Sequence, residues 1–274
     1  MKVKGKMNRT LTRLSLLILS LVVFSFMMVD KSYSKIDPET IVGVWLLDDA
    51  QGKTAVDSSK NAYDGKITGS QWVDGKFGKA LEFDGKADNV EVPDAKELDA
   101  IPQITVVCWV NYGKEPPQNY APVGKEPLYR FIIGKGGSGH FVVATAVNGW
   151  YSAGTVASGA NVTPGEWHHL AGTYDGNKVR FYVDGKLAGE GPQNIVGDIL
   201  DNGAGFTIAK TTANNVDFFA GVIDDIAVFK VAISEEDIKN IMAIGLEKTI
   251  VGKSAVSDHG KLSATWASIK LKVF

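Results

Sequence analysis

Two adjacent segments give the clearest indication of the fold: Trp167-His-His-Leu-Ala-Gly-Thr-Tyr-Asp-Gly176 and Lys178-Val-Arg-Phe-Tyr-Val-Asp-Gly-Lys-Leu-Ala188. Both runs are rich in β-branched and aromatic residues, and both contain Asp-Gly, a dipeptide that adopts positive φ at little cost and closes hairpins. Val179, Phe181 and Val183 alternate along the second run, which puts every second side chain on one face of a strand. We therefore predict antiparallel strands over 167–174 and 178–183, with a hairpin turn at Asp184-Gly185.

The same pattern recurs along most of the chain. Glycine makes up 30 of 274 residues, which favours tight turns and short strands. No helical segments alternate with the strands, so the sequence predicts an antiparallel sandwich or barrel and argues against a parallel α/β sheet. Further strands are expected at 41–47, 80–83, 89–92, 104–110, 129–133, 140–147, 206–209 and 221–229.

One short helix is predicted near the C-terminus, over 234–245. Ser234 is a typical N-cap, acidic residues follow it in the first turn, and Gly245 is a typical stop. Apolar residues recur between them at helical spacing, so the helix is expected to cover one end or edge of the strands. Residues 246–274 are rich in lysine and are expected to form an appendage outside the core, to which we assign no function.

The first 34 residues have the composition of a secretory signal peptide. Five basic residues and no acid occupy residues 1–13, a mostly apolar run covers 14–29, and Ser32-x-Ser34 suits a small-residue cleavage site. The alternative is an uncleaved N-terminal anchor, but the apolar run is shorter than the ~20 residues that a spanning helix needs. We predict an exported chain with no membrane span after cleavage.

Charge and cysteine content restrict the function further. The formal net charge is −2 and the calculated pI is about 6.1, so general affinity for nucleic acids is not expected. Cys108 is the only cysteine, which excludes an internal disulfide, and its place in the apolar run 104–110 predicts a small buried side chain rather than a nucleophile.

Several segments, taken in order, carry a family resemblance. Trp45-Leu-Leu-Asp-Asp-Ala-Gln-Gly52 and Asp57-Ser-Ser-Lys-Asn-Ala-Tyr-Asp-Gly65 look like its N-terminal signature, and Gly78-Lys-Ala-Leu-Glu-Phe-Asp-Gly85 matches the next element. The middle hairpin, from Gly165, and Gly221-Val-Ile-Asp-Asp-Ile-Ala-Val-Phe229 complete the pattern. The chain resembles the LamG-like jelly-roll domains of the concanavalin A-like lectin/glucanase superfamily over residues 41–245. The resemblance implies an all-β, two-sheet antiparallel jelly-roll sandwich over 35–245, used mostly for recognition.

The superfamily also contains enzymes, so the catalytic residues of its glucanase branch were sought. That branch carries Glu-x-Asp-x-x-Glu on one strand, and a retaining glycosidase needs two carboxylates about 5–5.5 Å apart. Three segments begin this motif, but each lacks its last glutamate, which is replaced by Ala87, Pro102 and Asn240. His168 and His169 are adjacent on a predicted strand, so their side chains face opposite ways and cannot share a metal. We predict a non-catalytic protein.

Calcium is the candidate cofactor. Related jelly rolls often hold a structural calcium between the N-terminal segment and the last core strand, and the matching acids here are Asp48 or Asp49, Asp57, and Asp224 or Asp225. Carboxylates in loops suit calcium, and an isolated buried carboxylate is costly. Adjacent acids on a strand face opposite ways, so only one of the last pair should point inward. The alternative is that these carboxylates cap turn amides.

Ligand contacts are expected from the long segments at the rim of the sandwich, because loops on rigid scaffolds carry recognition. Aromatic rings beside amides suit a sugar, which has apolar faces and polar edges. The alternative is a solvated loop whose aromatic side chains pack on their own sheet. The candidates are Tyr112, Gln118 and Tyr120 in 111–128, Trp150 and Tyr151 in 148–151, and Asn214 in 211–217.

The sequence therefore predicts an exported, non-catalytic module that binds a glycan or glycoconjugate. A protein-adhesion or structural module without a sugar site is the first alternative, with an extracellular protein as partner. A glycoside hydrolase or lyase of the same superfamily is the second.

Overall fold

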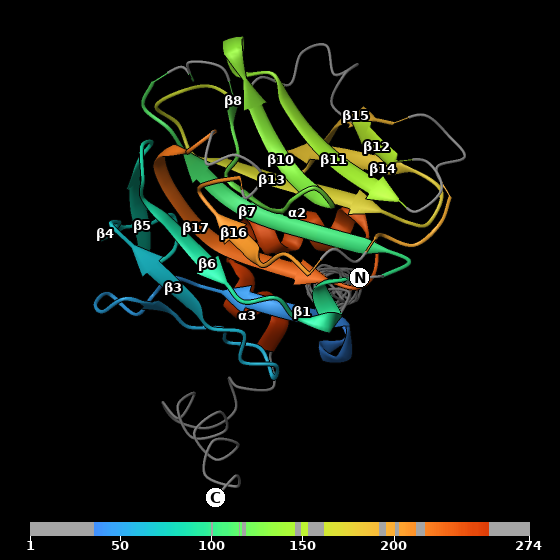
Figure 1. Ribbon diagram of the computed structural model, residues 1–274, viewed down its shortest axis with the longest axis horizontal. Coiled ribbons are helices and arrows are strands. Elements are labelled where there is room, and N and C mark those ends of the chain that lie inside the picture. The colour runs from blue at the N-terminus through green and yellow to red at the C-terminus, as the bar shows by residue number, and fades with distance from the viewer. Residues whose placement is uncertain are drawn as a thin grey trace, which may run out of the picture. The chain divides into compact units, whose positions relative to one another are not determined.

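The computed structural model describes residues 36–99, 101–114, 116, 119–145, 149–152, 162–191, 196–200, 203–211 and 217–251, with the backbone alone at 149–152 and 251. The signal peptide predicted at 1–34 lies outside these residues. Most described residues belong to strands of two antiparallel sheets (Figure 1).

Sheet A has the strand order β15-β14-β13-β7-β17-β5-β4, and β1 pairs with β17 off this path. Every pairing in it is antiparallel. Its strands are β1 (Ile41–Trp45), β4 (Gln71–Asp74), β5 (Lys79–Asp84), β7 (Ile104–Asn111), β13 (His168–Tyr174), β14 (Val179–Val183), β15 (Lys186–Glu190) and β17 (Ala220–Phe229).

Sheet B has the order β12-β11-β10-β9-β16-β6-β3-β2, and β8 pairs with β10. Its strands are β2 (Thr54–Ala55), β3 (Gly65–Thr68), β6 (Asn89–Val92), β8 (Asn119–Tyr120), β9 (Val123–Lys125), β10 (Tyr129–Gly134), β11 (Gly139–Thr145), β12 (Gly149–Ser152) and β16 (Phe206–Ile208). Three short 3-10 helices, η1 (Pro38–Thr40), η2 (Lys96–Leu98) and η3 (Lys135–Gly137), lie in connections.

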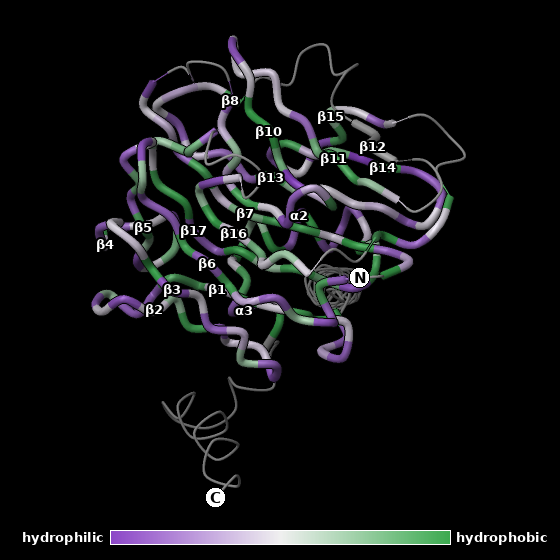
Figure 2. The backbone as a smooth tube through the Cα atoms, viewed as in Figure 1, coloured by the Kyte–Doolittle hydropathy of each residue, from purple (hydrophilic) through white to green (hydrophobic). Residues whose placement is uncertain are grey.

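The main core lies between the two sheets. Trp45 on sheet A stacks on Phe206 on sheet B with ring centroids 5.1 Å apart, and Phe181 packs on Phe131 at 5.9 Å. Inward side chains alternate with outward ones, as on β10, where Tyr129, Phe131 and Ile133 are buried in this core. Figure 2 shows the hydrophobic segments concentrated in the central strands. The prediction of a two-sheet jelly-roll sandwich is confirmed.

A second apolar layer covers the outer face of sheet A. Helix α2 (Glu235–Ile244) buries Ile238 and Ile241 against Val107 and Ala227, which point away from the main core. Ser234 caps the helix by accepting from the amide of Asp237, as the sequence predicted, and Gly245 ends it with φ 86°. None of the described helices has the length and apolar character needed to cross a bilayer.

The domain extends beyond Gly245. Helix α3 (Leu246–Val251) follows directly, and Leu246 is fully buried in the layer between α2 and sheet A. The first residues of the expected appendage therefore belong to the folded domain, because the apolar Leu246 extends the surface that α2 buries. Residues 252–274 lie outside the described residues.

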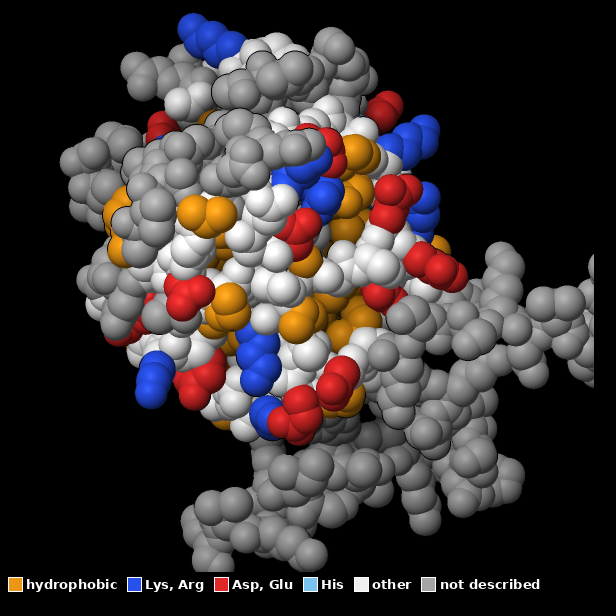
Figure 3. Space-filling view, turned by 90° about the vertical axis from the view of Figure 1, so that its right-hand side faces the viewer, with side chains coloured by type: hydrophobic (Ala, Val, Ile, Leu, Met, Phe, Trp, Pro, Cys, Tyr) orange, Lys and Arg blue, Asp and Glu red, His pale blue; other side chains and the backbone are white. Residues whose placement is uncertain are grey.

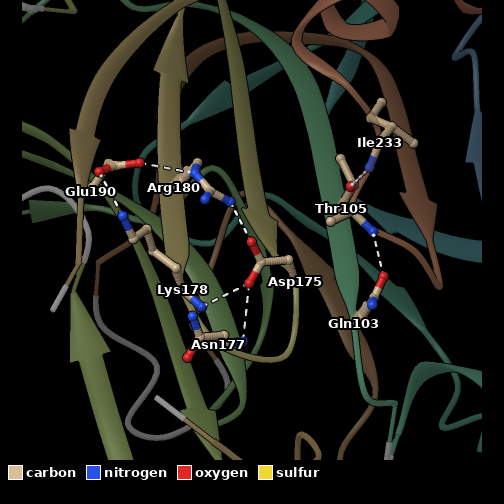
Figure 4. A network of polar contacts seen from close by, with 9 residues as sticks. Gln103, Thr105, Asp175, Asn177, Lys178, Arg180, Glu190 and Ile233 are labelled. Carbon is tan, nitrogen blue, oxygen red and sulfur yellow. Dashed lines mark hydrogen bonds and ion pairs between the residues drawn. The ribbon is translucent and has the colours of Figure 1, made fainter. Parts of the chain in front are cut away.

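Polar networks brace the outer side of sheet A (Figure 4). Arg180 on β14 contacts Glu190 on β15 through Nε at 2.9 Å and Asp175 through Nη1 at 2.5 Å, and Lys178 contacts Glu190 at 3.0 Å. The hydroxyl of Thr105 on β7 donates to the carbonyl of Val231, which fixes the chain between β17 and α2. On the face in Figure 3, acidic, basic and hydrophobic side chains are interspersed, without a large area of one charge among the described residues.

Candidate functional site

An aromatic cluster underlies one end of the sandwich, where β7 ends, β8 begins and β17 begins. Tyr112 and Tyr120 pack edge to face with centroids 5.7 Å apart, and Phe219 packs on Tyr120 at 5.4 Å. All three side chains are buried, at 0, 4 and 0% exposure. We call Tyr112, Tyr120 and Phe219 the aromatic base.

Hydrogen bonds tie the rim segments to this base. The Tyr112 hydroxyl donates to the carbonyl of Val162 at 2.5 Å, and the amide of Gly165 donates to the carbonyl of Tyr112 at 2.7 Å. The amide of Ala121 donates to the carbonyl of Asp217 at 3.1 Å. Three connections that are far apart in sequence are thus anchored at one place, which provides a fixed platform for loops.

The expected ligand residues have different outcomes. The rings of Tyr112 and Tyr120 are buried, which corrects the expectation that they stack on a sugar at the rim. Tyr112 directly follows β7, Tyr120 belongs to β8, and both rings pack on Phe219. Trp150 and Tyr151 belong to β12, paired in register with Ala144 and Val143. Gln118 and Asn214 lie outside the described residues.

The first of the acidic side chains, Asp57, is occupied by donors from its own loop. Its Oδ1 accepts from the amides of Val44 and Ser59, and its Oδ2 accepts from the Ser59 hydroxyl and the amide of Tyr63, each at 2.8 Å. Asp57 is 4% exposed. It therefore fastens its loop to β1, which is the turn-capping alternative that the sequence left open.

Asp224 and Asp225 are both buried on the outer side of sheet A, at 0 and 3% exposure. This corrects the expectation that the two side chains face opposite ways: the register shifts at this point of β17, and Asp225 has φ 45°, so alternation is interrupted. Asp224 accepts from the amide of Phe77 at 2.9 Å, and Asp225 accepts from the amide of Leu246 at 3.0 Å.

Loop 75–78 brings Asp48 to the same region. Asp48 is exposed and accepts from the amide of Lys79 at 2.6 Å. A Cβ at Gly78, whose φ is 61°, would lie 2.0 Å from Asp48 Oδ1, and one at Gly75 would lie 2.6 Å from Asp224 Oδ2. Glycine at these two positions lets the backbone approach both carboxylates. We call Asp48, Asp224 and Asp225 the acidic cluster.

Burial governs the protonation of the two buried members of the acidic cluster. Desolvation raises the pKa of Asp224 to about 8, and the neighbouring charge of Asp225 adds to the rise. Desolvation likewise raises the pKa of Asp225 to about 7, with contributions from Asp48 and Glu247. Neither aspartate forms an ion pair with any described residue.

The two adjacent histidines have separate environments. His168 accepts from the amide of Thr163 through Nε2 at 3.0 Å, so its Nδ1 carries the hydrogen that reaches Asp184 Oδ2 at 2.8 Å. Burial alone would raise the pKa of Asp184, but the bond from His168 holds it below its usual value. His169 faces away from His168 and packs on Trp109 with centroids 5.2 Å apart. Their predicted separation is confirmed. The Thr163–His168–Asp184 chain was missed, because its members are spread over three segments.

The incomplete glucanase motif on β5 is also used structurally. Asp84 Oδ1 accepts from the amides of Lys86, Ala87 and Asp88, so this carboxylate caps the turn after β5. Glu82 is exposed on the outer side of the strand. Cys108 is buried, and desolvation raises the pKa of its thiol. Within the described residues, no three His, Cys, Asp or Glu side chains are already arranged to hold a metal ion.

Comparison with known proteins gives a family match and several structural neighbours. A family model described as the concanavalin A-like lectin/glucanases superfamily matches residues 84–239. No curated protein matches the sequence. The superfamily includes both enzymes and non-enzymes.

Solved structures share the fold at low identity. Domain 4 of AbnA, a GH43 extracellular arabinanase from Geobacillus stearothermophilus in complex with arabinotriose, is 21% identical with TM-score 0.58, over 74% of this chain and 98% of that one. The binding domain of Paraclostridial Mosquitocidal Protein 1 is 15% identical with TM-score 0.61, over 75% and 52%. Trypanosoma rangeli sialidase in complex with sialic acid is 17% identical with TM-score 0.58, over 74% of this chain and only 33% of the enzyme.

Proposed function

Because this chain belongs to the concanavalin A-like lectin/glucanase superfamily, we propose that it is an exported, non-catalytic module that binds a glycan or glycoconjugate. The observation that carries the proposal is the aromatic base, which fixes three rim connections at one end of a rigid sandwich. Two neighbours of the same fold were solved with carbohydrate ligands, arabinotriose and sialic acid, which supports a sugar as the class of ligand.

The non-catalytic part of the proposal rests on the motif residues of this chain. Asp84 holds three turn amides and is followed by Ala87 where the glucanase pattern needs a glutamate. A retaining glycosidase needs a nucleophile and an acid about 5–5.5 Å apart, and Glu82 has no third carboxylate of the motif to work with. Incubation with polysaccharides should therefore release neither reducing ends nor unsaturated sugars.

Calcium at the acidic cluster is a further part of the proposal. Asp57 does not fit as a ligand, because protein donors already occupy both of its oxygens. Asp48, Asp224 and Asp225 are the ligands we propose instead, since two of them are buried with raised pKa values and no described cationic partner. These three residues would hold the ion, and its positive charge would offset the free-energy cost of burying ionised carboxylates.

A glycan array probed with the whole protein, with and without calcium, tests the proposed function. We expect glycan signal from the intact protein, reduced at least about tenfold in affinity by Gln118→Ala with Asn214→Ala, a loss of about 1.4 kcal/mol. Asn177→Ala is the matched control, because it also removes an exposed amide side chain. Asn177 lies in the turn after β13, whereas the anchored segment around Thr163 precedes this strand.

The array also separates the alternatives. Binding that survives the double variant would move the site away from the rim. Absence of signal from the intact protein on every glycan, with binding to an extracellular protein instead, would contradict the sugar site and support an adhesion module.

A further inference from the structure

At the end of β9, on the inward face of sheet B, a fully buried lysine amine lies between two carboxyl groups. Lys125, the last residue of β9, is 0% exposed, and its Nζ lies 2.5 Å from Asp94 Oδ1 and 3.0 Å from Asp99 Oδ1. The amine also donates to the carbonyl of Ala204. Lys125 faces the interior because its register partner on β10, Tyr129, is buried in the main core.

The two carboxyl groups differ in environment. Asp99 is 4% exposed in its side chain, whereas Asp94 is 42% exposed. Burial raises the pKa of Asp99 to about 6, and the negative charge of Asp94 contributes to the rise. The hydrogen bond from Lys125 lowers the pKa of Asp94. A proton shared by this cluster therefore resides on Asp99, while Asp94 remains a carboxylate.

The contact between Lys125 and Asp99 is not an aligned hydrogen bond. Among the described residues, no donor makes an aligned hydrogen bond to Asp99 Oδ1, although the amine is only 3.0 Å away. The amine is therefore held against the carboxyl group without the directional bond that normally offsets burial of such a pair. A nucleophile next to a neutral carboxylic acid, with a second carboxylate as base, is a reactive arrangement.

We propose that Lys125 and Asp99 condense to form an intramolecular isopeptide bond. Asp94 takes a proton from the Lys125 ammonium, and the freed electron pair on Nζ attacks Cγ of the protonated Asp99. The C–O bond of the leaving hydroxyl breaks as Asp94 returns the proton to it, and one water departs. The second proton of the attacking nitrogen is lost through Asp94, which is partly exposed, to solvent, so that an amide N–H remains. The bond formed is Nζ–Cγ, no oxidant or other reactant is consumed, and Asp94 ends as it began.

The proposed bond joins parts that otherwise meet only through noncovalent contacts. Asp99 lies in the connection 93–103, which leaves sheet B at β6 and enters sheet A at β7, whereas Lys125 lies on β9 in the middle of sheet B. The crosslink would close a loop of chain between these residues and restrain the unfolded state, as a disulfide does, in a protein whose only cysteine is Cys108.

Intact mass measured after denaturation is the first test. We expect the intact mass of the purified protein to be one water lower than the mass calculated from its sequence. The calculated mass starts at the observed N-terminal residue, so that signal-peptide cleavage does not affect the comparison. Asp94→Asn, which keeps the amine and Asp99 but removes the base, should have the full mass. A wild-type protein of full mass would overturn the proposal, and a lighter Asp94→Asn protein would remove the role of Asp94.

Tryptic mapping is the decisive test, because dehydration of an Asp-Gly sequence also removes one water. Trypsin cleaves at Lys96, which separates Asp94, in peptide 87–96, from Asp99, in peptide 97–114. We expect peptide 97–114 joined to peptide 115–130, with Lys125 uncleaved. Free peptide 126–130 in stoichiometric amount, or a water loss confined to an Asp-Gly peptide, would refute the bond. A crosslink to peptide 87–96 would refute the choice of Asp99. Lys125→Arg is the control in which the crosslinked pair must vanish.

Discussion

From the acidic cluster we predict that the calcium-free protein loses stability as the pH rises through neutrality. An unfolded aspartate has a pKa near 3.9, whereas burial raises the pKa of Asp224 to about 8 and that of Asp225 to about 7. Above about pH 4 the folded state thus binds more protons than the unfolded state. Under this condition the free energy of unfolding falls with increasing pH until the folded-state pKa values are passed.

In the window from about pH 6.5 to about pH 8, the change in stability comes mainly from these two groups. Burial lowers the pKa of His169 to about 4, so its folded side chain is neutral throughout the window. The unfolded histidine, with a pKa of about 6.5, still binds part of a proton at the lower end of the window and offsets about 0.4 kcal/mol of the loss. Integrating the linkage relation over the window gives a loss of about 2 kcal/mol, of which Asp224 contributes the larger part.

Urea denaturation in the presence of a chelator, at several pH values across this window, measures the loss. Asp224→Asn should remove more than half of the pH dependence, because the amide cannot ionise. Glu82→Gln is the matched control, since it makes the same charge change at an exposed position on β5. Added calcium should flatten the wild-type dependence by holding both carboxylates ionised. Stability that stays constant or rises with pH in the chelator would refute the reasoning.

Two further predictions concern packing and capping. Gly172→Ala should destabilise the protein by about 1–3 kcal/mol or more, because its Cβ would lie 2.1 Å from the Phe141 ring across the sandwich, whereas Gly113→Ala, with nothing within 4 Å, should change little in the same urea titration. Ser234→Ala should cost about 1 kcal/mol through loss of the cap on the Asp237 amide, and a thermal midpoint equal to that of wild type would contradict this role.

Local sequence patterns were sufficient for the long strands and for α2. Alternating apolar residues at Val179, Phe181 and Val183 and the turn at Asp184-Gly185, whose φ values are 50 and 70°, reproduce the predicted hairpin. Ser234 and Gly245 bound α2 as predicted. These features are decided by residues close together in the chain.

Short strands and the site depend on distant residues, which is why sequence reasoning missed them. Strand β9 contains only Val123, Gly124 and Lys125, and its pairing with β10 and β16 is not visible in so short a run. The burial of Tyr112 and Tyr120 depends on Phe219, about a hundred residues further along the chain. The positive φ of Asp225 overrides the alternation on which the prediction for the Asp224 pair was based.

The place of β17 in sheet A affects when the domain can fold during its synthesis. This strand pairs with β1, β5 and β7, yet it is the last strand of the domain to be synthesised, at 220–229. Three earlier strands therefore remain without this partner until residues 220–229 are synthesised, and sheet A cannot be completed before then. A nascent chain halted before residue 220 would expose three open edges and tend to aggregate. The domain reaches its native form only after β17 has been synthesised.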